Sequence, residues 1–599
     1  ITLAAEAKIV VNKIIAYIEN KNAGSWQNNV VFLGDDGDQN RHMRSTEDTA
    51  EALEDCTSDM NIKRVMWDTF KRESSSTGNT YPEIEKLIKE QQESGALIFN
   101  YSGHGRADML SHEFVIELSD FENYRNDNLS FWITAACGVR PYDHRINHFG
   151  NVALLNANGG CIGFYGTGHS VFPGPNTAIN TALIRALFTR VNGNYVSIGE
   201  AQRIAKNNLI SKKGDLTENK LQYVLLGDPA LKLNIPQQKV VIDNINGKTL
   251  SENDELINLK AASVATISGH IDNNGNMDEK FNGLATIIVR DAKKKVICRQ
   301  NDAAAANVPF EYYDRTSTIF KGNTSVVDGK FTFVFAIPKD IEYTGESGLI
   351  TAFAVDNTTF KTAHGHSYQF EASETEDVYT DSIGPSIYCY LNSPSFQNGA
   401  TVNPTPFFYA EITDKDGINT AGSAYGHDMQ LVIDSDVNQT YSLNDNFSFE
   451  LGDYTKGTTY YSIPALSPGK HTLRFRAWDI LNNSSTTTLT FNVANSVTPD
   501  LLDVSCTKNP ARDNTTFIIT HDRKGSPVTA EIEVMTMAGR PLWRKTVKAT
   551  TSSGSLLVDW DLTMESGGKL QTGVYLYRVR LSSDGSDSVT KAKKLIILN

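Results

Sequence analysis

The chain has 599 residues, which is too many for one hydrophobic core, so three to five domains are expected. Its 56 Lys and Arg against 70 Asp and Glu give a formal net charge of −14, which argues against a nucleic-acid partner. No apolar run in the sequence is long enough to span a bilayer. The six cysteines are thinly spread and form no CxxC pair, which excludes a disulfide-rich scaffold and argues against a cysteine zinc site. The sequence begins at Ile1, without an initiator Met or a signal peptide, so a processed or truncated form is expected.

Residues 1–236 alternate between helix and strand patterns. The expected elements are a helix over 6–20, strands over 30–33 and 62–66, a helix over 82–92, strands over 97–99, 131–136 and 161–165, and helices over 176–189 and 198–209. Ser45 or Thr46 is expected to cap one further helix. This alternation predicts an α/β domain with a mostly parallel sheet covered on both faces.

After residue 236 the helical periodicity ends, and short strands recur between turn signals. Strands are expected over 285–289, 330–335, 472–478, 486–493 and 595–598. We predict a β-sandwich module over 237–382, an Ig-like β-sandwich module over 383–497 and a compact β unit over 498–599. The chain is therefore expected to be multidomain, with an α/β domain followed by all-β modules.

Two of the buried strands end on reactive side chains. The strand over 97–99 delivers His104 between two glycines, and the strand over 131–136 delivers Cys137. The carboxyl ends of parallel strands open on one crevice, where a thiol and an imidazole make a nucleophile and a base. The backbone N–H groups of Gly105 and Cys137 are candidate oxyanion donors, and Asp35 or Asp36 is the candidate carboxylate that orients the imidazole. The alternative is that Cys137 is a buried apolar side chain and that His104 is a turn residue.

Two acidic loops are candidate calcium sites. The loop over 35–38 offers three carboxylates but lacks EF-hand spacing, and the loop from Asp272 to Asp278 is better explained as a hairpin loop. No cofactor is therefore expected, and Ca²⁺ in the loop over 35–38 is a minority alternative.

Three motifs resemble the gingipain family of cysteine peptidases. They are Tyr101-Ser-Gly-His-Gly105, Ile133-Thr-Ala-Ala-Cys137 and Leu225-Leu-Gly-Asp-Pro-Ala-Leu231, in the order that the family shows. The resemblance covers residues 1 to about 236 and implies a caspase-like fold with His104 as base, Cys137 as nucleophile and Gly105 as oxyanion donor. It also implies a carboxylate in the Asp35-Asp36 loop, with Asp36 preferred, and a further upstream α/β subdomain. The catalytic domain is therefore expected to be N-terminally incomplete.

The last hundred residues resemble type IX secretion sorting domains. The motifs are Asn509-Pro510, Met537-Ala-Gly-Arg540, Gly573-Val-Tyr-Leu-Tyr577 and Lys591-Ala-Lys-Lys594. The resemblance implies export to the cell surface, peripheral to the outer membrane of a Bacteroidetes-type bacterium. It also implies an outer-membrane β-barrel shuttle or anchor protein that binds residues 498–599.

The middle region resembles the β modules of sortase members of the same family. The resemblance lies in Ile242-Asp-Asn-Ile-Asn-Gly247, Asp414-Lys-Asp-Gly-Ile-Asn419 and Arg476-Ala-Trp-Asp-Ile-Leu-Asn-Asn483. It implies a cysteine endopeptidase and transpeptidase that removes C-terminal sorting domains from secreted cargo proteins. The new carboxyl end would pass to anionic lipopolysaccharide through a Cys137 thioacyl intermediate. A secreted gingipain-like degradative protease and an inactive adhesin or scaffold with a peptidase fold are the alternatives.

Overall fold

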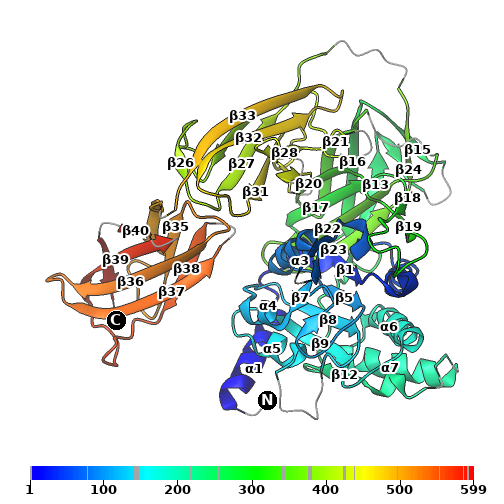
Figure 1. Cartoon of the computed structure of the whole chain (residues 1–599), viewed down its shortest axis with the longest axis horizontal. Coiled ribbons are helices and arrows are strands. Elements are labelled where there is room, and N and C mark those ends of the chain that lie inside the picture. Colours follow the sequence, from blue (N-terminus) through cyan, green and yellow to red (C-terminus); the bar gives the residue numbers. More distant parts are fainter. Residues whose placement is uncertain are drawn as a thin grey trace. The chain divides into compact units, whose positions relative to one another are not determined.

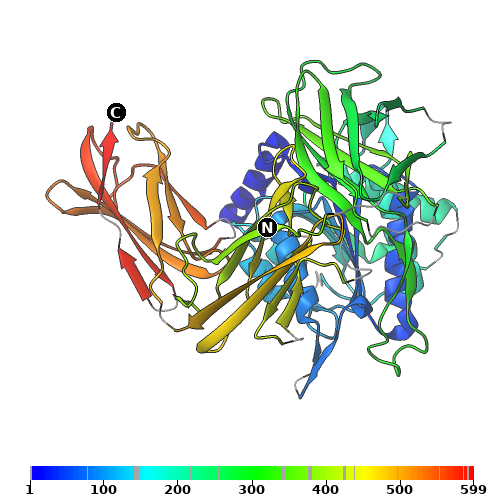
Figure 2. The same ribbon diagram turned by 90° about the horizontal axis from the view of Figure 1, so that it is seen from above.

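The computed structural model divides the chain into two compact units. The first comprises Ile1–Phe335 and Ile341–Glu374, and the second comprises Ala336–Asp340 and Thr375–Asn599; each is described by itself (Figures 1 and 2). The described residues are 3–76, 78–140, 147–212, 214–215, 217–251, 255–339, 345–375, 381–421, 426–436, 439–444, 446–495, 497–551, 554–583, 586–589 and 592–598. Among them, no helix has the length and apolar character needed to cross a membrane.

The first unit begins with an α/β domain built on a six-stranded sheet in the order β12-β9-β8-β5-β1-β2. Its strands are β1 (Asn29–Gly34), β2 (Asn61–Met66), β5 (Ile98–Ser102), β8 (Ser130–Ala135), β9 (Cys161–Thr167) and β12 (Tyr223–Leu226). All neighbouring pairs are parallel except β12 with β9, which is antiparallel at the edge. The predicted mostly parallel sheet is confirmed.

Helices cover both faces of this sheet, as the ribbon in Figure 1 shows. They are α1 (Ala4–Glu19), α2 (Arg41–Glu54), α3 (Pro82–Ser94), α4 (Leu118–Asn123), α5 (Phe149–Leu155), α6 (Pro173–Leu187) and α7 (Ile198–Ser211), with 3₁₀ turns η1 (Ser25–Asn28), η2 (Asp38–Asn40), η3 (Trp67–Thr69) and η4 (Asn219–Leu221). Side chains of each strand alternate between two cores, so Val30 packs with α2, α6 and α7 while Val31 packs with α3, α4 and α5. Both faces are apolar because both are buried.

The start of α2 differs from the expectation. The helix begins at Arg41 with Asn40 as its N-cap, and Ser45 and Thr46 lie inside it. The Thr46 hydroxyl donates to the His42 carbonyl at 3.0 Å, one turn back, which is the bond that a hydroxyl inside a helix makes. The earlier start places His42 next to the loop that follows β1.

The α/β domain also contains short antiparallel strand pairs outside its central sheet, and a β module follows it within the same unit. The pairs are β3 (Glu73–Ser75) with β4 (Gly78–Thr80), β6 (Met109–Leu110) with β7 (Ile116–Glu117), and β10 (Arg190–Val191) with β11 (Asn194–Tyr195). The module has an eight-stranded sheet made of β13 (Gln238–Ile245), β14 (Lys248–Thr249), β16 (Val264–Asp272), β17 (Gly283–Arg290), β20 (Thr318–Val326), β21 (Lys330–Ala336), β22 (Leu349–Asp356) and β23 (Thr362–Ser367). It also holds the pairs β15 (Ile257–Lys260) with β24 (Phe370–Ser373) and β18 (Lys294–Ile297) with β19 (Glu311–Asp314).

A buried arginine joins the α/β domain to this β module. The Arg64 guanidinium on β2 is 1% exposed and pairs with Glu47 at 2.8 Å, Glu54 at 3.0 Å and Asp314 at 3.2 Å. Beside it, Met43 and Met66 pack against Phe310 and Tyr312 of the module. The α/β domain and the first β module therefore share a core within one compact unit.

The second unit is all β. One part has two sheets, formed by β25 (Ser386–Leu391), β27 (Phe407–Thr413), β31 (Lys456–Ser462) and β30 (Ser448–Phe449), and by β26 (Thr401–Val402), β33 (Ser484–Val493), β32 (Gly469–Trp478), β28 (Gln430–Ile433) and β29 (Thr440–Ser442). Phe408 and Phe475 link these sheets with ring centroids 5.1 Å apart. The predicted Ig-like sandwich architecture is confirmed.

The C-terminal part of that unit also has two sheets. They are formed by β34 (Leu501–Cys506), β35 (Thr515–His521) and β38 (Ser555–Trp560), and by β36 (Pro527–Thr536), β37 (Pro541–Thr550), β39 (Gly573–Ser583), β40 (Ser586–Val589) and β41 (Lys593–Ile597). Phe517 and Ile532, one from each sheet, belong to a single hydrophobic core. The bounds of the four domains expected from the sequence stay predictions.

Candidate active site

The strands that precede His104 and Cys137 are neighbours. β5 and β8 run parallel with Ser102 opposite Ala135, and the Gly103 N–H donates to the Ala135 carbonyl at 3.3 Å. His104 and Cys137 each lie two residues beyond this last register pair. The structure therefore places both residues at the same end of the sheet, as the sequence predicts.

The glycines that flank His104 let its loop pack closely. A Cβ on Gly103 would lie 2.5 Å from Asp35 Cβ, and one on Gly105 would lie 2.8 Å from Val139 Cγ1 and 2.9 Å from Ala136 Cβ. Such distances are shorter than packed carbon atoms permit. Gly105 therefore lies directly against the turn that carries Cys137.

The His104 ring is held among three polar side chains. Its Nε2 lies 3.1 Å from Asp38 Oδ2, its face stacks on His112 at 4.2 Å, and His42 meets it edge to face at 4.8 Å. Burial and the charge of His112 lower the pKa of His104, against the raising effect of Asp38. An imidazole with a lowered pKa is neutral at pH 7 and can accept a proton from a thiol.

Cys137 is half-buried and packs against the core on the α6 and α7 side. Its Sγ donates to the Val171 carbonyl at 3.4 Å and accepts from the Val171 N–H at 3.5 Å. Within the described part of the chain, the thiol and the His104 imidazole make no direct hydrogen bond with each other. The two strand ends thus carry a thiol and an imidazole that are each held by their own partners.

The two expected oxyanion donors are free in this structure. Among the described residues, neither the Gly105 N–H nor the Cys137 N–H donates a hydrogen bond, whereas the N–H groups of Arg106 and Gly138 do. A free amide pair beside a nucleophile is the arrangement that stabilises a developing oxyanion.

The three carboxylates of the loop after β1 each contact a different group. Asp36 Oδ2 accepts a hydrogen bond from the Tyr81 hydroxyl at 2.8 Å and does not contact the His104 ring. Asp35 Oδ2 accepts the His104 backbone N–H at 2.9 Å, so it holds the loop and not the imidazole. The carboxylate at the ring is Asp38, which corrects the preference for Asp36.

Asp38 reaches His104 because the chain turns through a left-handed stretch. Gly37, Asp38, Gln39 and Asn40 all have positive φ, at 74°, 45°, 57° and 62°. Gly, Asp and Asn are the residues that adopt this region most readily. The sequence signal that could have identified Asp38 is its position four residues before His42, which also reaches it, at 3.4 Å.

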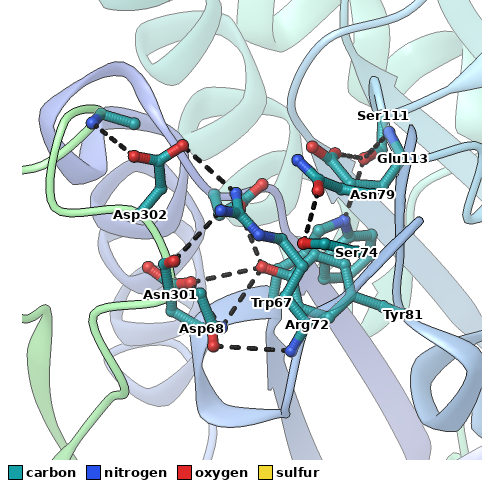
Figure 3. A network of polar contacts seen from close by, with 12 residues as sticks. Trp67, Asp68, Arg72, Ser74, Asn79, Tyr81, Ser111, Glu113, Asn301 and Asp302 are labelled. Atoms are coloured by element: carbon teal, nitrogen blue, oxygen red, sulfur yellow. Dashed lines mark hydrogen bonds and ion pairs between the residues drawn. The ribbon is translucent and has the colours of Figure 1, made fainter. Parts of the chain in front are cut away.

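A polar network extends from this loop to the β module. Figure 3 shows Arg72 between Asp302 and Asn301, with Asn301 also bonded to Asp68 at 2.9 Å. The Tyr81 hydroxyl lies 3.3 Å from Asp68 Oδ1 as well. The residues behind the candidate site are therefore tied to the segment around Asn301.

Among the residues that the structure describes, two groups of side chains could hold a metal ion. One is Asp38, His42 and His104, and the other is Asp35, Asp36 and Glu113. Sequence reasoning missed His42, His112 and Glu113. The i,i+4 spacing from Asp38 could have identified His42, whereas nothing in the local pattern of His112 and Glu113 links them to the loop after β1.

An α/β sheet that presents a histidine and a cysteine at adjacent parallel strand ends is the arrangement of caspase-like cysteine peptidases. Residues 1–234 match the sequence model of Peptidase family C25, which confirms that this part of the chain resembles the gingipain family of cysteine peptidases. No curated protein matches the chain.

Among solved structures, the chain is similar to dimeric latent PorU from Porphyromonas gingivalis. The identity is 34%, the match covers 69% of this chain and 39% of PorU, and the TM-score is 0.33. It is also similar to the Arg-specific cysteine proteinase gingipain R, at 14% identity over 62% of this chain and 74% of that one, with a TM-score of 0.33. It is similar as well to the complex of pro- and mature domains of Porphyromonas gingivalis RgpB. The identity is 14%, the match covers 62% of this chain and 75% of that one, and the TM-score is 0.33. The chain thus spans about two fifths of the length of PorU.

Proposed function

We propose that this protein is a cysteine endopeptidase in which Cys137 is the nucleophile and His104 is the base. The observation that carries the proposal is the pairing of β5 with β8, which places these two residues at one end of the sheet beside two free amides. The match of residues 1–234 to Peptidase family C25 supports the same chemistry.

The proposed reaction proceeds by acyl transfer. The Cys137 thiol leaves Val171 and gives its proton to Nδ1 of His104, the ring nitrogen that does not face Asp38, and the thiolate attacks the peptide carbonyl. The N–H groups of Gly105 and Cys137 hold the oxyanion. His104 then protonates the leaving amine, which leaves a thioester on Cys137 that water or an amine resolves.

Asp38 takes the role of positioning residue for His104. Its carboxylate contacts Nε2 at 3.1 Å, so it fixes the ring and stabilises the imidazolium that forms during proton transfer. When the thiol proton moves to the ring, the contact becomes an ion pair. Asp35 contributes by holding the His104 backbone N–H.

The finer proposal is a sortase, as in PorU. The protein would remove C-terminal sorting domains from type IX secretion cargo and transfer the new carboxyl end to anionic lipopolysaccharide on the outer face of the outer membrane. The motifs at residues 242–247, 414–419 and 476–483 support this assignment. The β sandwich formed by β34 to β41 would be the retained sorting domain, which an outer-membrane β-barrel partner would bind.

The test uses the full-length protein that carries this chain, with a cargo protein that ends in a sorting domain. Wild type should release the sorting domain at one site and form a conjugate with a lipopolysaccharide amine, and Cys137→Ala should do neither. Digestion of casein without site-specific release of the sorting domain would contradict the sortase proposal and indicate a degradative protease. Unchanged cargo processing by Cys137→Ala would overturn the proposed peptidase activity and favour an adhesin or scaffold function.

A further inference from the structure

Three carboxylates are buried together behind His104. Asp35 and Asp36 follow β1, and Glu113 lies on the loop between β6 and β7. They are 1%, 8% and 9% exposed, and each offers an oxygen within 4.8 Å of the others. Their meeting joins two loops that are far apart in the sequence.

The cluster lacks a compensating charge of its own. Arg72 Nη1 lies 3.9 Å from Asp36 Oδ2, but it also pairs with Asp302 at 3.4 Å. Burial, then the charge of Asp36, raises the pKa of Asp35 well above its usual range, and burial, then Glu113, raises that of Asp36 to about 6. Three buried carboxylates with one shared arginine need a further cation or must hold protons.

One oxygen of each carboxylate accepts a hydrogen bond. Asp35 Oδ2 accepts the His104 N–H, Asp36 Oδ2 accepts from Tyr81, and Glu113 Oε2 accepts from the Ser111 hydroxyl, the last of which Figure 3 shows. Asp35 Oδ1 is fully buried and has no hydrogen-bond partner in the described part of the chain. Such an orphaned carboxylate oxygen indicates a missing ligand rather than a satisfied cluster.

We propose that Asp35, Asp36 and Glu113 bind a divalent cation of the oxygen-preferring class, with Ca²⁺ as the ion that fits best. The donor set contains oxygen only, which favours Ca²⁺ over zinc. Three oxygens within 4.8 Å of one another leave a central ion at most about 2.8 Å from each, close to the ordinary Ca²⁺–oxygen distance of about 2.4 Å, so a small closure of the loops lets one ion touch all three carboxylates. Mg²⁺, at about 2.1 Å, would need the loops to close further.

The ion would fix the loop of the catalytic base. Asp35 holds the His104 N–H, and Ser111, which bonds Glu113, donates its own N–H to the His104 carbonyl at 3.0 Å. A cation between Asp35 and Glu113 would therefore clamp both sides of the His104 backbone. This is a binding site separate from the proposed nucleophile and base, and its test does not need enzyme activity.

The experiment measures ion binding directly on the Cys137→Ala protein, which removes self-cleavage. Tb³⁺ takes the place of Ca²⁺, and its luminescence is excited through aromatic side chains. Trp67 Nε1 lies 3.2 Å from Ser111 Oγ and Tyr81 contacts Asp36, so both are placed to sensitise it. We expect a saturable Tb³⁺ signal that Ca²⁺ displaces, and isothermal titration with CaCl₂ after treatment with chelator should give the same stoichiometry of one.

Glu113→Gln keeps the shape of the side chain and removes its charge, so the Ca²⁺ dissociation constant should rise at least tenfold. The matched control is Asp278→Asn in the other acidic loop, which should leave that constant unchanged. Wild-type melting temperature should also rise by several degrees at Ca²⁺ concentrations about 100 times the dissociation constant. This measurement keeps the proposal testable if Glu113→Gln fails to fold.

Folded protein that shows neither saturable Tb³⁺ binding nor a Ca²⁺-dependent rise in melting temperature would overturn the proposal. Binding that survives Glu113→Gln and disappears in Asp278→Asn would place the ion in the loop over 272–278 instead, and would overturn the proposal equally.

Discussion

The carboxylate of Asp38 lies 3.1 Å from His104 Nε2, and the intervening loops bring together two residues that belong to different strand ends. Asp38 is 48% exposed at its side chain, whereas Asp35 and Asp36 on the same loop are buried. The exposed Asp38 carboxylate contacts the His104 ring. The buried Asp35 and Asp36 carboxylates accept hydrogen bonds from the His104 backbone N–H and from tyrosine hydroxyls.

Asp38→Asn should lower kcat/KM for peptide cleavage by about 100-fold, because the amide cannot stabilise the imidazolium that forms on His104. The limb of the pH–rate profile that reports His104 should move to lower pH in the variant, because the Asp38 carboxylate raises the pKa of that ring, and a merely structural role would not move it. Asp108→Asn is the matched control, since Asp108 is exposed and pairs with Arg106 near the same loop. An equal loss of kcat/KM in both variants would contradict the proposal that Asp38 positions His104.

Gly105→Ala should lower kcat/KM at least tenfold while the protein stays folded. The new methyl group would lie 2.8 Å from Val139 Cγ1 and 2.9 Å from Ala136 Cβ, so the loop must move away from Cys137 and take the Gly105 N–H with it. Gly174→Ala, where an added Cβ meets nothing within 4 Å, should change neither activity nor melting temperature. Full activity of Gly105→Ala would exclude Gly105 as an oxyanion donor.

Arg64→Leu should destabilise the first unit by about 3 kcal/mol, measured by urea unfolding. The substitution leaves Glu47, Glu54 and Asp314 without their shared cation in a buried place, and breaking a buried pair from one side typically costs about 3–5 kcal/mol. Arg203→Leu is the comparison, because Arg203 is 62% exposed and pairs only with Glu200 on the helix surface. A comparable loss in the two variants would contradict the coupling of the α/β domain to the β module through Arg64.

The C-terminal β sandwich should lose stability as pH falls from about 6.5 to 4. His521 is fully buried and accepts the Arg523 N–H at 3.1 Å, and burial, then the charge of Arg523, lowers its pKa to about 4. The unfolded state binds a proton near pH 6.5 and the folded state does not, so stability is complete above that pH and falls below it by about 1 kcal/mol per pH unit. His521→Asn, whose Oδ1 can replace Nδ1 as acceptor, should flatten this slope in calorimetric melts of the module. An unchanged slope in the variant would assign the pH dependence to another group.

The local pattern of the sequence was sufficient for the sheet and for the two reactive residues. Continuous apolar runs mark β5 and β8 as buried strands, and a buried strand must end before a run such as Ser-Gly-His-Gly, so His104 and Cys137 fall at strand ends whatever the loops do. The helices at α3, α6 and α7 follow from 3.6-residue periodicity within a few residues of their observed bounds.

The path of the loops could not be predicted in the same way. The capping residue of α2 was misplaced because the left-handed stretch from Gly37 to Asn40 starts the helix early, and that stretch is stabilised partly by Gln39 and Asn40 bonding to Ala305 and Val308 of the β module. A partner more than 260 residues away leaves no trace in a local pattern.

By itself, the sequence determined that this chain has a mostly parallel α/β domain with a thiol and an imidazole at its strand ends, followed by β sandwiches. Only the tertiary structure decided that Asp38, and not Asp36, reaches the imidazole, and that Glu113 joins Asp35 and Asp36 in a buried cluster. The physical reason is the range of the forces involved. Strand and helix patterns record which face of a local segment is buried, whereas the meeting of charged side chains from separate loops depends on where the whole chain has placed those loops.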